Sequence, residues 1–189
     1  VLEGRSTAIG QTSSFGPFVD LLRRWAGILD DEDDAEALAK LATAIAAVVA
    51  DPDESLPFVA TLMGLRLDGA HAERVEGIDG EALESLIVKH VRDLLHALAA
   101  SRPLVLVFED LHWADESMLR FVELLGASAR DVPLLLLCTA RPELIDRDPS
   151  WAGSITGSLT ITLPPLRDTG IASLYAHMFG QAAFSADLL

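Results

Sequence analysis

The sequence contains little positive charge. Of its 189 residues, 14 are Lys or Arg and 29 are Asp or Glu, which gives a net charge of −15. Only two of the basic residues are lysines, Lys40 and Lys89. Because contacts with nucleic-acid phosphates need clustered Lys and Arg, this balance argues against a nucleic-acid-binding surface.

Cysteine and long hydrophobic runs are also scarce. The single cysteine, Cys138, has no partner for an internal disulfide, and no Cys/His spacing suits a structural zinc site. We therefore expect a reducing, cytoplasmic setting. The longest apolar runs, such as 104–108 and 133–138, have the length of strands and fall far below the roughly 20 residues that span a bilayer. No secretory signal is present, and the missing initial Met leads us to expect a piece of a longer protein.

Half of the residues are apolar, and their spacing predicts strands and helices that alternate along the chain. Unbroken apolar runs predict strands buried on both faces at 104–108 and 133–139, with a further strand at 159–163 and the end of one at 1–3. A Gly/Ser/Thr-rich loop is expected at 4–16 and another loop at 68–80. Helical periodicity and caps predict helices beginning at Pro17 and at 35–50, 56–65, 81–100, 115–128 and 168–179.

This alternation predicts an α/β fold with a mainly parallel sheet and right-handed crossovers. Ligands of such sheets bind beyond the carboxyl ends of the strands. The strand at 104–108 is followed directly by two carboxylates, Glu109 and Asp110. These acids either simply close an apolar segment, or they form an acidic strand end at which one carboxylate holds Mg²⁺ and the next polarises an attacking water.

The continuation favours the second interpretation. The segment Glu109-Asp110-Leu111-His112-Trp113-Ala114-Asp115, after its apolar strand, resembles the Walker B segment of STAND-class ATPases, which are relatives of the AAA family. Within that class the chain is most similar to the ATPase region of large LuxR-type transcriptional regulators and to ATPase modules attached to bacterial adenylate cyclases and protein kinases. The resemblance implies a P-loop NTPase-type parallel sheet flanked by helices, with residues 1–189 forming a partial domain.

The resemblance also assigns roles to three residues. Glu109 matches the acid associated with Mg²⁺ and Asp110 matches the acid that orients the attacking water, and both are candidate Mg²⁺ residues, directly or through water. Arg141 follows the strand at 133–139 and matches the sensor of the γ-phosphate, which its planar guanidinium fork suits chemically. The alternative for Arg141 is a helix-capping role or an ion pair with Glu143.

Other polar residues near the acids have simpler interpretations. His112 either pairs with one of the acids or contacts a neighbouring loop, and Trp113 is expected to pack and fix the turn. Asp115 is predicted to cap the following helix. Cys138 is expected to be a buried small residue without nucleophilic chemistry. The remaining histidines share no ligand spacing, and the acidic run at 30–34 is expected to begin a helix.

The phosphate-binding half of a nucleotide site is absent from this sequence. No Gly-x-x-x-x-Gly-Lys-Ser/Thr segment occurs, and neither Lys40 nor Lys89 follows a glycine. The resemblance places this loop and its strand before the segment that matches Val1, and places that strand between the fourth and fifth strands of the sheet. We therefore expect this piece not to bind ATP measurably, and its segment 159–163 to be displaced or irregularly paired.

Two functions of different classes follow from these features. The first is an ATP-binding and ATP-hydrolysing signal-transduction switch, for which the resemblance implies ATP, Mg²⁺, an effector domain in the same polypeptide and nucleotide-dependent self-association. The second is a degenerate scaffold or partner-binding module that no longer turns over nucleotide. An unrelated Rossmann or flavodoxin-like domain is disfavoured because no Gly-x-Gly-x-x-Gly follows a strand.

Overall fold

The computed structural model describes residues 1–7, 15–151, 153, 155 and 157–179. The chain divides into two compact units, residues 1–156 and 157–189. Most of the loop expected at 4–16 lies outside the described residues, whereas its first residues belong to a strand. None of the helices in the described part combines the length and apolar character that crossing a membrane requires.

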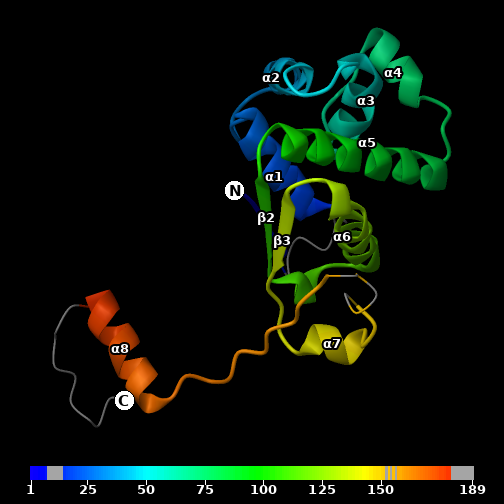
Figure 1. Cartoon of the computed structure of the whole chain (residues 1–189). Coiled ribbons are helices and arrows are strands. Elements are labelled where there is room, and N and C mark those ends of the chain that lie inside the picture. The colour runs from blue at the N-terminus through cyan, green and yellow to red at the C-terminus, as the bar shows by residue number, and fades with distance from the viewer. Residues whose placement is uncertain (8–14, 152, 154, 156, 180–189) are drawn as a thin grey trace. The chain divides into compact units, whose positions relative to one another are not determined.

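The first unit is built around a parallel sheet, as the sequence predicted (Figure 1). Its described strands are β1 (Leu2–Arg5), β2 (Leu104–Glu109) and β3 (Leu134–Cys138). They lie in the order β1-β2-β3, so that β2 is central and pairs with both neighbours. The carboxyl ends of all three strands therefore meet at one edge of the sheet.

Helices with polar caps connect these strands. Asp33, Asp51, Asp79 and Asp115 each accept a backbone N–H in the first turn of a helix, which satisfies one of its free amides. The helices are α1 (Gly16–Ala26), α2 (Asp34–Ala46), α3 (Pro52–Leu62), α4 (Gly69–Val75), α5 (Gly80–Ser101), α6 (Glu116–Ser128) and α7 (Glu143–Arg147). Short 3₁₀ turns follow β2 at Leu111–Trp113 and α6 at Ala129–Asp131.

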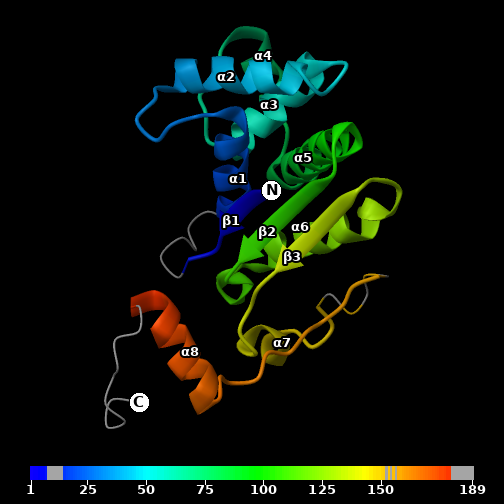
Figure 2. The ribbon, with the colours of Figure 1, turned by 60° about the vertical axis from the view of Figure 1, so that its left-hand side comes forward.

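The core of the first unit lies between the sheet and helices on one of its faces. Phe18 of α1 lies 4.9 Å from Phe108 of β2 and stacks on Phe121 of α6 with ring centroids 4.2 Å apart. Both crossovers move across the sheet in the same direction, so right-handed connections place their helices on the same face. Figure 2 shows α5 and α6 behind the sheet, on this side.

The opposite face of the sheet is open, which corrects the expectation that β2 and β3 are buried on both faces. Leu104, Leu106 and Phe108 are buried, but the alternating Val105 and Val107 are only half-buried.

On β3, which pairs in register with β2, Leu135 and Leu137 are 58% and 52% exposed. We refer to Val105, Val107, Leu135 and Leu137 as the open face. The unbroken apolar runs thus identified both strands correctly. They did not predict which faces of the strands are buried, since no described helix of residues 1–156 packs over these side chains.

The helices between β1 and β2 required further corrections. The helix expected at 56–65 begins earlier, at Pro52, so that Pro57 lies inside it rather than in its first turn. Asp51 caps this helix, and a proline at the first helical position needs no hydrogen-bond partner for its nitrogen. The loop expected at 68–80 contains α4, whose side chains are not buried and therefore leave no apolar period in the sequence.

The second unit contains one described helix, α8 (Asp168–Phe179), where the sequence predicted it. The strand expected at 159–163 is absent: the segment has no regular structure, and its apolar side chains are exposed. Strands form by pairing their backbone groups with a neighbour, and the described sheet contains three strands that do not include this segment. The expectation that it would lack a regular partner therefore agrees with the structure.

Candidate functional site

The candidate site begins where β2 ends, at the carboxyl edge of the sheet. Glu109 is the last residue of β2, and Asp110 follows in the left-handed conformation, with φ 57° and ψ 37°. Asp is one of the few non-glycine residue types that adopt this conformation readily, because its short side chain bonds locally. The turn therefore reverses the chain immediately after the strand and places both carboxylates at the edge.

Hydrogen bonds to Thr139, the residue that follows β3, hold this turn in place. The Asp110 amide donates to the Thr139 hydroxyl oxygen over 3.2 Å, and the Leu111 amide donates to the Thr139 carbonyl over 2.9 Å. The Thr139 amide in turn donates to the Phe108 carbonyl, also over 2.9 Å. The two strand ends are thereby fixed to each other beyond the last ladder pair of the sheet.

Arg5, the last residue of β1, forms an ion pair with Asp110. Its Nε and Nη2 lie 2.8 Å and 2.7 Å from the same carboxylate oxygen, Oδ2. The hydrogen bond and the negative charge of Asp110, followed by the charge of Glu109, raise the pKa of Arg5 above its ordinary value. The site therefore joins an acid pair on β2 to a cation on β1.

Arg141 stands two residues after Thr139, beyond the end of β3. Its side chain is exposed, and its carbonyl accepts a hydrogen bond from the Leu144 amide at the start of α7. The described part of the chain contains no ion pair between Arg141 and Glu143, so this half of the alternative for Arg141 is wrong, whereas its carbonyl does lie at the start of a helix. The structure thus places Arg141 and the acids after neighbouring strands, at the same edge.

His112 does not pair with the acids. Both of its ring nitrogens are buried and have no hydrogen-bond partner in the described part of the chain, while its ring lies 4.9 Å from that of Trp113. Its carbonyl accepts from Arg147 of α7, which also donates to Ala114 and so ties α7 to the turn after β2. The prediction for Asp115 is confirmed, since its carboxylate accepts the Met118 amide of α6.

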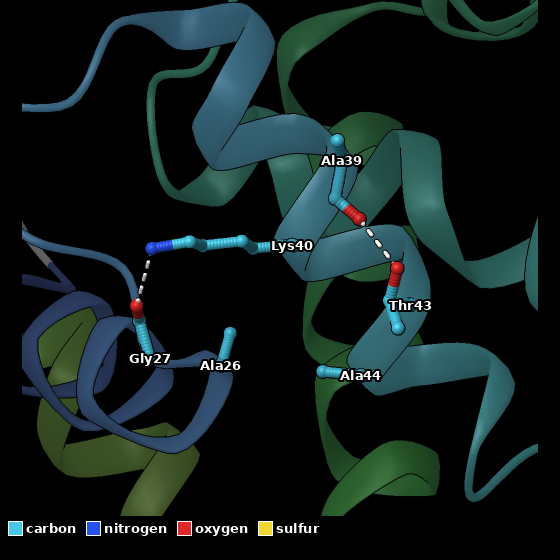
Figure 3. A pocket seen from close by; sticks show the side chains of 6 residues that line it. All are labelled: Ala26, Gly27, Ala39, Lys40, Thr43 and Ala44. Carbon is cyan, nitrogen blue, oxygen red and sulfur yellow. Dashed lines mark hydrogen bonds between the residues drawn. The ribbon is translucent and has the colours of Figure 1, made fainter.

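The remaining polar residues singled out in the sequence lie apart from this edge. Lys40 of α2 donates to the Gly27 carbonyl and pairs with Glu32, beside a hollow of about 380 Å³ between α1 and α2 (Figure 3). Lys89 pairs with Asp93 one turn further along α5. Neither lysine is therefore placed at the strand ends.

Cys138 was expected to be buried but is only half-buried, whereas its expected lack of nucleophilic chemistry agrees with its environment. Burial raises the pKa of its thiol to about 11, so the thiolate that a nucleophile requires is disfavoured. No group of three or more His, Cys, Asp or Glu suited to a metal occurs among the described residues. A metal centre built entirely of protein ligands is thus not part of the described structure.

The chemistry of the acid pair nevertheless suits Mg²⁺. Mg²⁺ prefers oxygen ligands and keeps several waters, so it is commonly held by one or two carboxylates together with substrate phosphates. Glu109 and Asp110 supply such carboxylates at an accessible strand end. The described residues and the sequence provide no Gly-Lys-Ser/Thr loop for the phosphates.

A parallel sheet flanked by helices, with paired carboxylates after its central strand, defines an α/β domain of the P-loop NTPase type. A family model for the AAA ATPase domain matches residues 1–137. The match covers most of the chain, which therefore belongs to the AAA ATPase domain family. Comparisons with curated proteins and with solved structures found no match.

Two residues of the site were not identified from the sequence, Arg5 and Thr139. Arg5 is 105 positions away from Asp110 along the chain, so no local spacing connects them. The predicted topology could have indicated both residues. Each one ends or follows a predicted parallel strand, and the carboxyl ends of parallel strands lie at the same edge of a sheet. The family match ends two residues before Thr139, so it does not cover β3's final residue or Arg141.

Proposed function

We propose that this domain supplies the acidic, metal-handling half of the ATP site in a signal-transduction switch. Its membership of the AAA ATPase domain family supports nucleotide binding as the general role. The observation that carries the proposal is the position of Glu109 and Asp110 after the central strand of the parallel sheet, with Arg141 after the adjacent strand. The effector controlled by the switch is a further domain of the same polypeptide, as in the regulators that the chain resembles.

In this proposal each residue has a distinct task. Glu109 holds Mg²⁺, directly or through water, and Asp110 accepts a hydrogen bond from the attacking water and orients it. Arg141 contacts the γ-phosphate with its guanidinium and loses that contact on hydrolysis. When bound, Mg²⁺ supplies charge neutralisation for the phosphate oxygens. Nucleotide-dependent contacts at Arg141 then set the conformation of α7, whose first turn is bonded to the Arg141 carbonyl.

The test requires a chain that joins this domain to the Gly-Lys-Ser/Thr loop, which the family resemblance places before the segment matching Val1. Asp110→Asn retains the shape of the side chain but removes its negative charge. We expect it to lower the rate of ATP hydrolysis by about 10²-fold or more, as loss of a general base does, while the Kd for ATP changes little.

Asp131→Asn is the matched control, because Asp131 is an exposed acid just before β3, at the opposite edge of the sheet. It should leave both hydrolysis and the Kd unchanged. An equal loss of binding and hydrolysis in Asp110→Asn would contradict the role given to this acid. An Asp110→Asn variant as active as the parent would contradict the proposal altogether and favour a scaffold function.

A further inference from the structure

Arg5 occupies a carboxylate oxygen that the proposed function requires. Two of its nitrogens converge on Oδ2 of Asp110, at 2.8 Å and 2.7 Å, although the Arg5 side chain is 64% exposed. Glu109 is the register partner of Arg5 in the ladder between β1 and β2, so the guanidinium stands beside both acids. Both acids raise its pKa, Asp110 through the hydrogen bond and its charge and Glu109 through its charge alone.

Within the described part of the chain, Arg5 is the cation that pairs with this acid edge. Arg147 is engaged with the carbonyls of His112 and Ala114, and the two lysines pair with acids away from this edge, Glu32 and Asp93. The backbone of Asp110 is fixed on its other side by Thr139. Removing Arg5 from the carboxylate would thus leave the position of the acid largely set but its charge uncompensated.

We propose that Arg5 is a resident counter-ion that competes with a divalent cation for Asp110, so that metal binding frees the Arg5 side chain. This inference rests on the proposed function, because it assumes that the cation binds at Glu109 and Asp110. A guanidinium and a divalent cation repel each other at contact distance, and both seek the same oxygen lone pairs. Cation binding at the acids and the Arg5–Asp110 pair therefore weaken each other.

Because of this exchange, the environment of the Arg5 side chain at the end of β1 depends on whether a metal is bound. Arg5 is the final residue of that strand, and the Ser6 amide still donates to the Glu109 carbonyl over 2.9 Å. Breaking the side-chain pair therefore changes the partner of the guanidinium without dissolving the ladder. Arg5 acts through Asp110 and is a positioning residue rather than a catalytic one.

The experiment follows Mn²⁺ binding to the full chain by electron paramagnetic resonance, together with the Arg5 Nε–H resonance in nitrogen-15 spectra. Arg5→Gln should tighten Mn²⁺ binding by about two- to fivefold, the range that corresponds to a partly exposed ion pair. Arg102→Gln is the control, because it removes the same charge from an exposed site before β2, at the other edge of the sheet. In the unsubstituted chain, Mg²⁺ should shift the Arg5 resonance in a saturable way.

The outcomes separate this inference from the proposed function. If neither Glu109→Gln nor Asp110→Asn weakens Mn²⁺ binding, the cation does not bind at the acids and the metal role itself fails. If either acid variant weakens binding but Arg5→Gln equals Arg102→Gln, only the role of Arg5 is overturned. Mn²⁺ binding that is detected in Arg5→Gln but not in the parent chain supports competition between Arg5 and the cation. If neither protein binds Mn²⁺, the proposed competition is overturned.

Discussion

The backbone amide of Asp110 donates a hydrogen bond to the hydroxyl oxygen of Thr139, 3.2 Å away across the ends of β2 and β3. This bond joins two strands beyond their ladder and supports the left-handed conformation at Asp110, with φ 57°. The Thr139 side chain thus helps to position Asp110 by bonding its backbone amide rather than its carboxylate. A residue outside the acid pair therefore shapes the site.

Thr139→Val should weaken this turn. Val preserves the branched shape of Thr but cannot accept the Asp110 amide, so the free energy of unfolding should fall by about 1 kcal/mol, the usual net value of one hydrogen bond. Urea denaturation followed by circular dichroism measures the change. Thr160→Val, at an exposed position, should remain within about 0.5 kcal/mol of the parent chain. Equal effects of the two substitutions would argue against a structural role for the bond.

Gly4→Ala should disturb the contact between β1 and α1. A Cβ at Gly4 would lie 2.1 Å from the carbonyl oxygen of Pro17, which is backbone and cannot rotate away. Overpacking of this kind costs about 1–3 kcal/mol, and we expect the upper part of that range in a urea melt. Gly80→Ala is the control, since a Cβ there meets open space at the first residue of α5. A Gly4→Ala protein as stable as the control would show that the helix shifts without cost.

His90 should make the stability of the first unit depend on pH. Its ring is buried, stacks on Phe58 with centroids 4.5 Å apart, and lies 3.4 Å from the Ser55 hydroxyl. Burial, and then the charge of Lys89, lower the pKa of His90 below its ordinary value. Protonation therefore favours the unfolded chain.

The sign of this effect follows from the two pKa values. The stabilising contribution of neutral His90 is complete above the unfolded pKa, about 6.5, and is lost as the pH falls through the lower folded pKa. We expect the free energy of unfolding to be smaller at pH 5 than at pH 7.5. Gln at position 90 should reduce this difference, whereas Gln at the exposed His177 should not. An unchanged difference in His90→Gln would assign the effect to other groups, among them His96, whose pKa burial also lowers.

The chain by itself should not bind ATP measurably. Its two lysines pair with Glu32 and Asp93, which lie outside the site, and the sequence contains no Gly-Lys-Ser/Thr loop to neutralise the phosphates. Isothermal calorimetry with Mg²⁺ present should therefore give no saturable heat at millimolar ATP. A micromolar Kd would mean that other residues bind the phosphates and would require a different site.

Local sequence was sufficient for most element types. Continuous apolar runs identified β2 and β3, and the acidic run at 30–34 and the cap Asp115 marked helix starts that the structure confirms. These features depend on interactions within a few residues, which is why they can be predicted without tertiary information. The acidic pair after β2 was likewise visible, because the strand and the turn are contiguous in sequence.

Tertiary structure decided what lies beside these elements. The open face is as apolar as a sheet face that helices cover; it consists of Val105, Val107, Leu135 and Leu137. Only the direction of the crossovers shows which face of the sheet the helices cover. The failure of 159–163 to form a strand has a related cause, since an apolar sequence becomes a strand only where a neighbour offers backbone partners.

The sequence alone showed that lysine is scarce and that the acids Glu109 and Asp110 follow an apolar strand. These two features led to the proposal that the chain supplies the acidic rather than the phosphate-binding half of a nucleotide site. The partnership of Arg5 with Asp110 was decided only by the fold, which brings residues 105 positions apart to one edge. Parallel pairing of β1 with β2 is the physical reason, because it aligns the carboxyl ends of strands that the sequence separates by five helices.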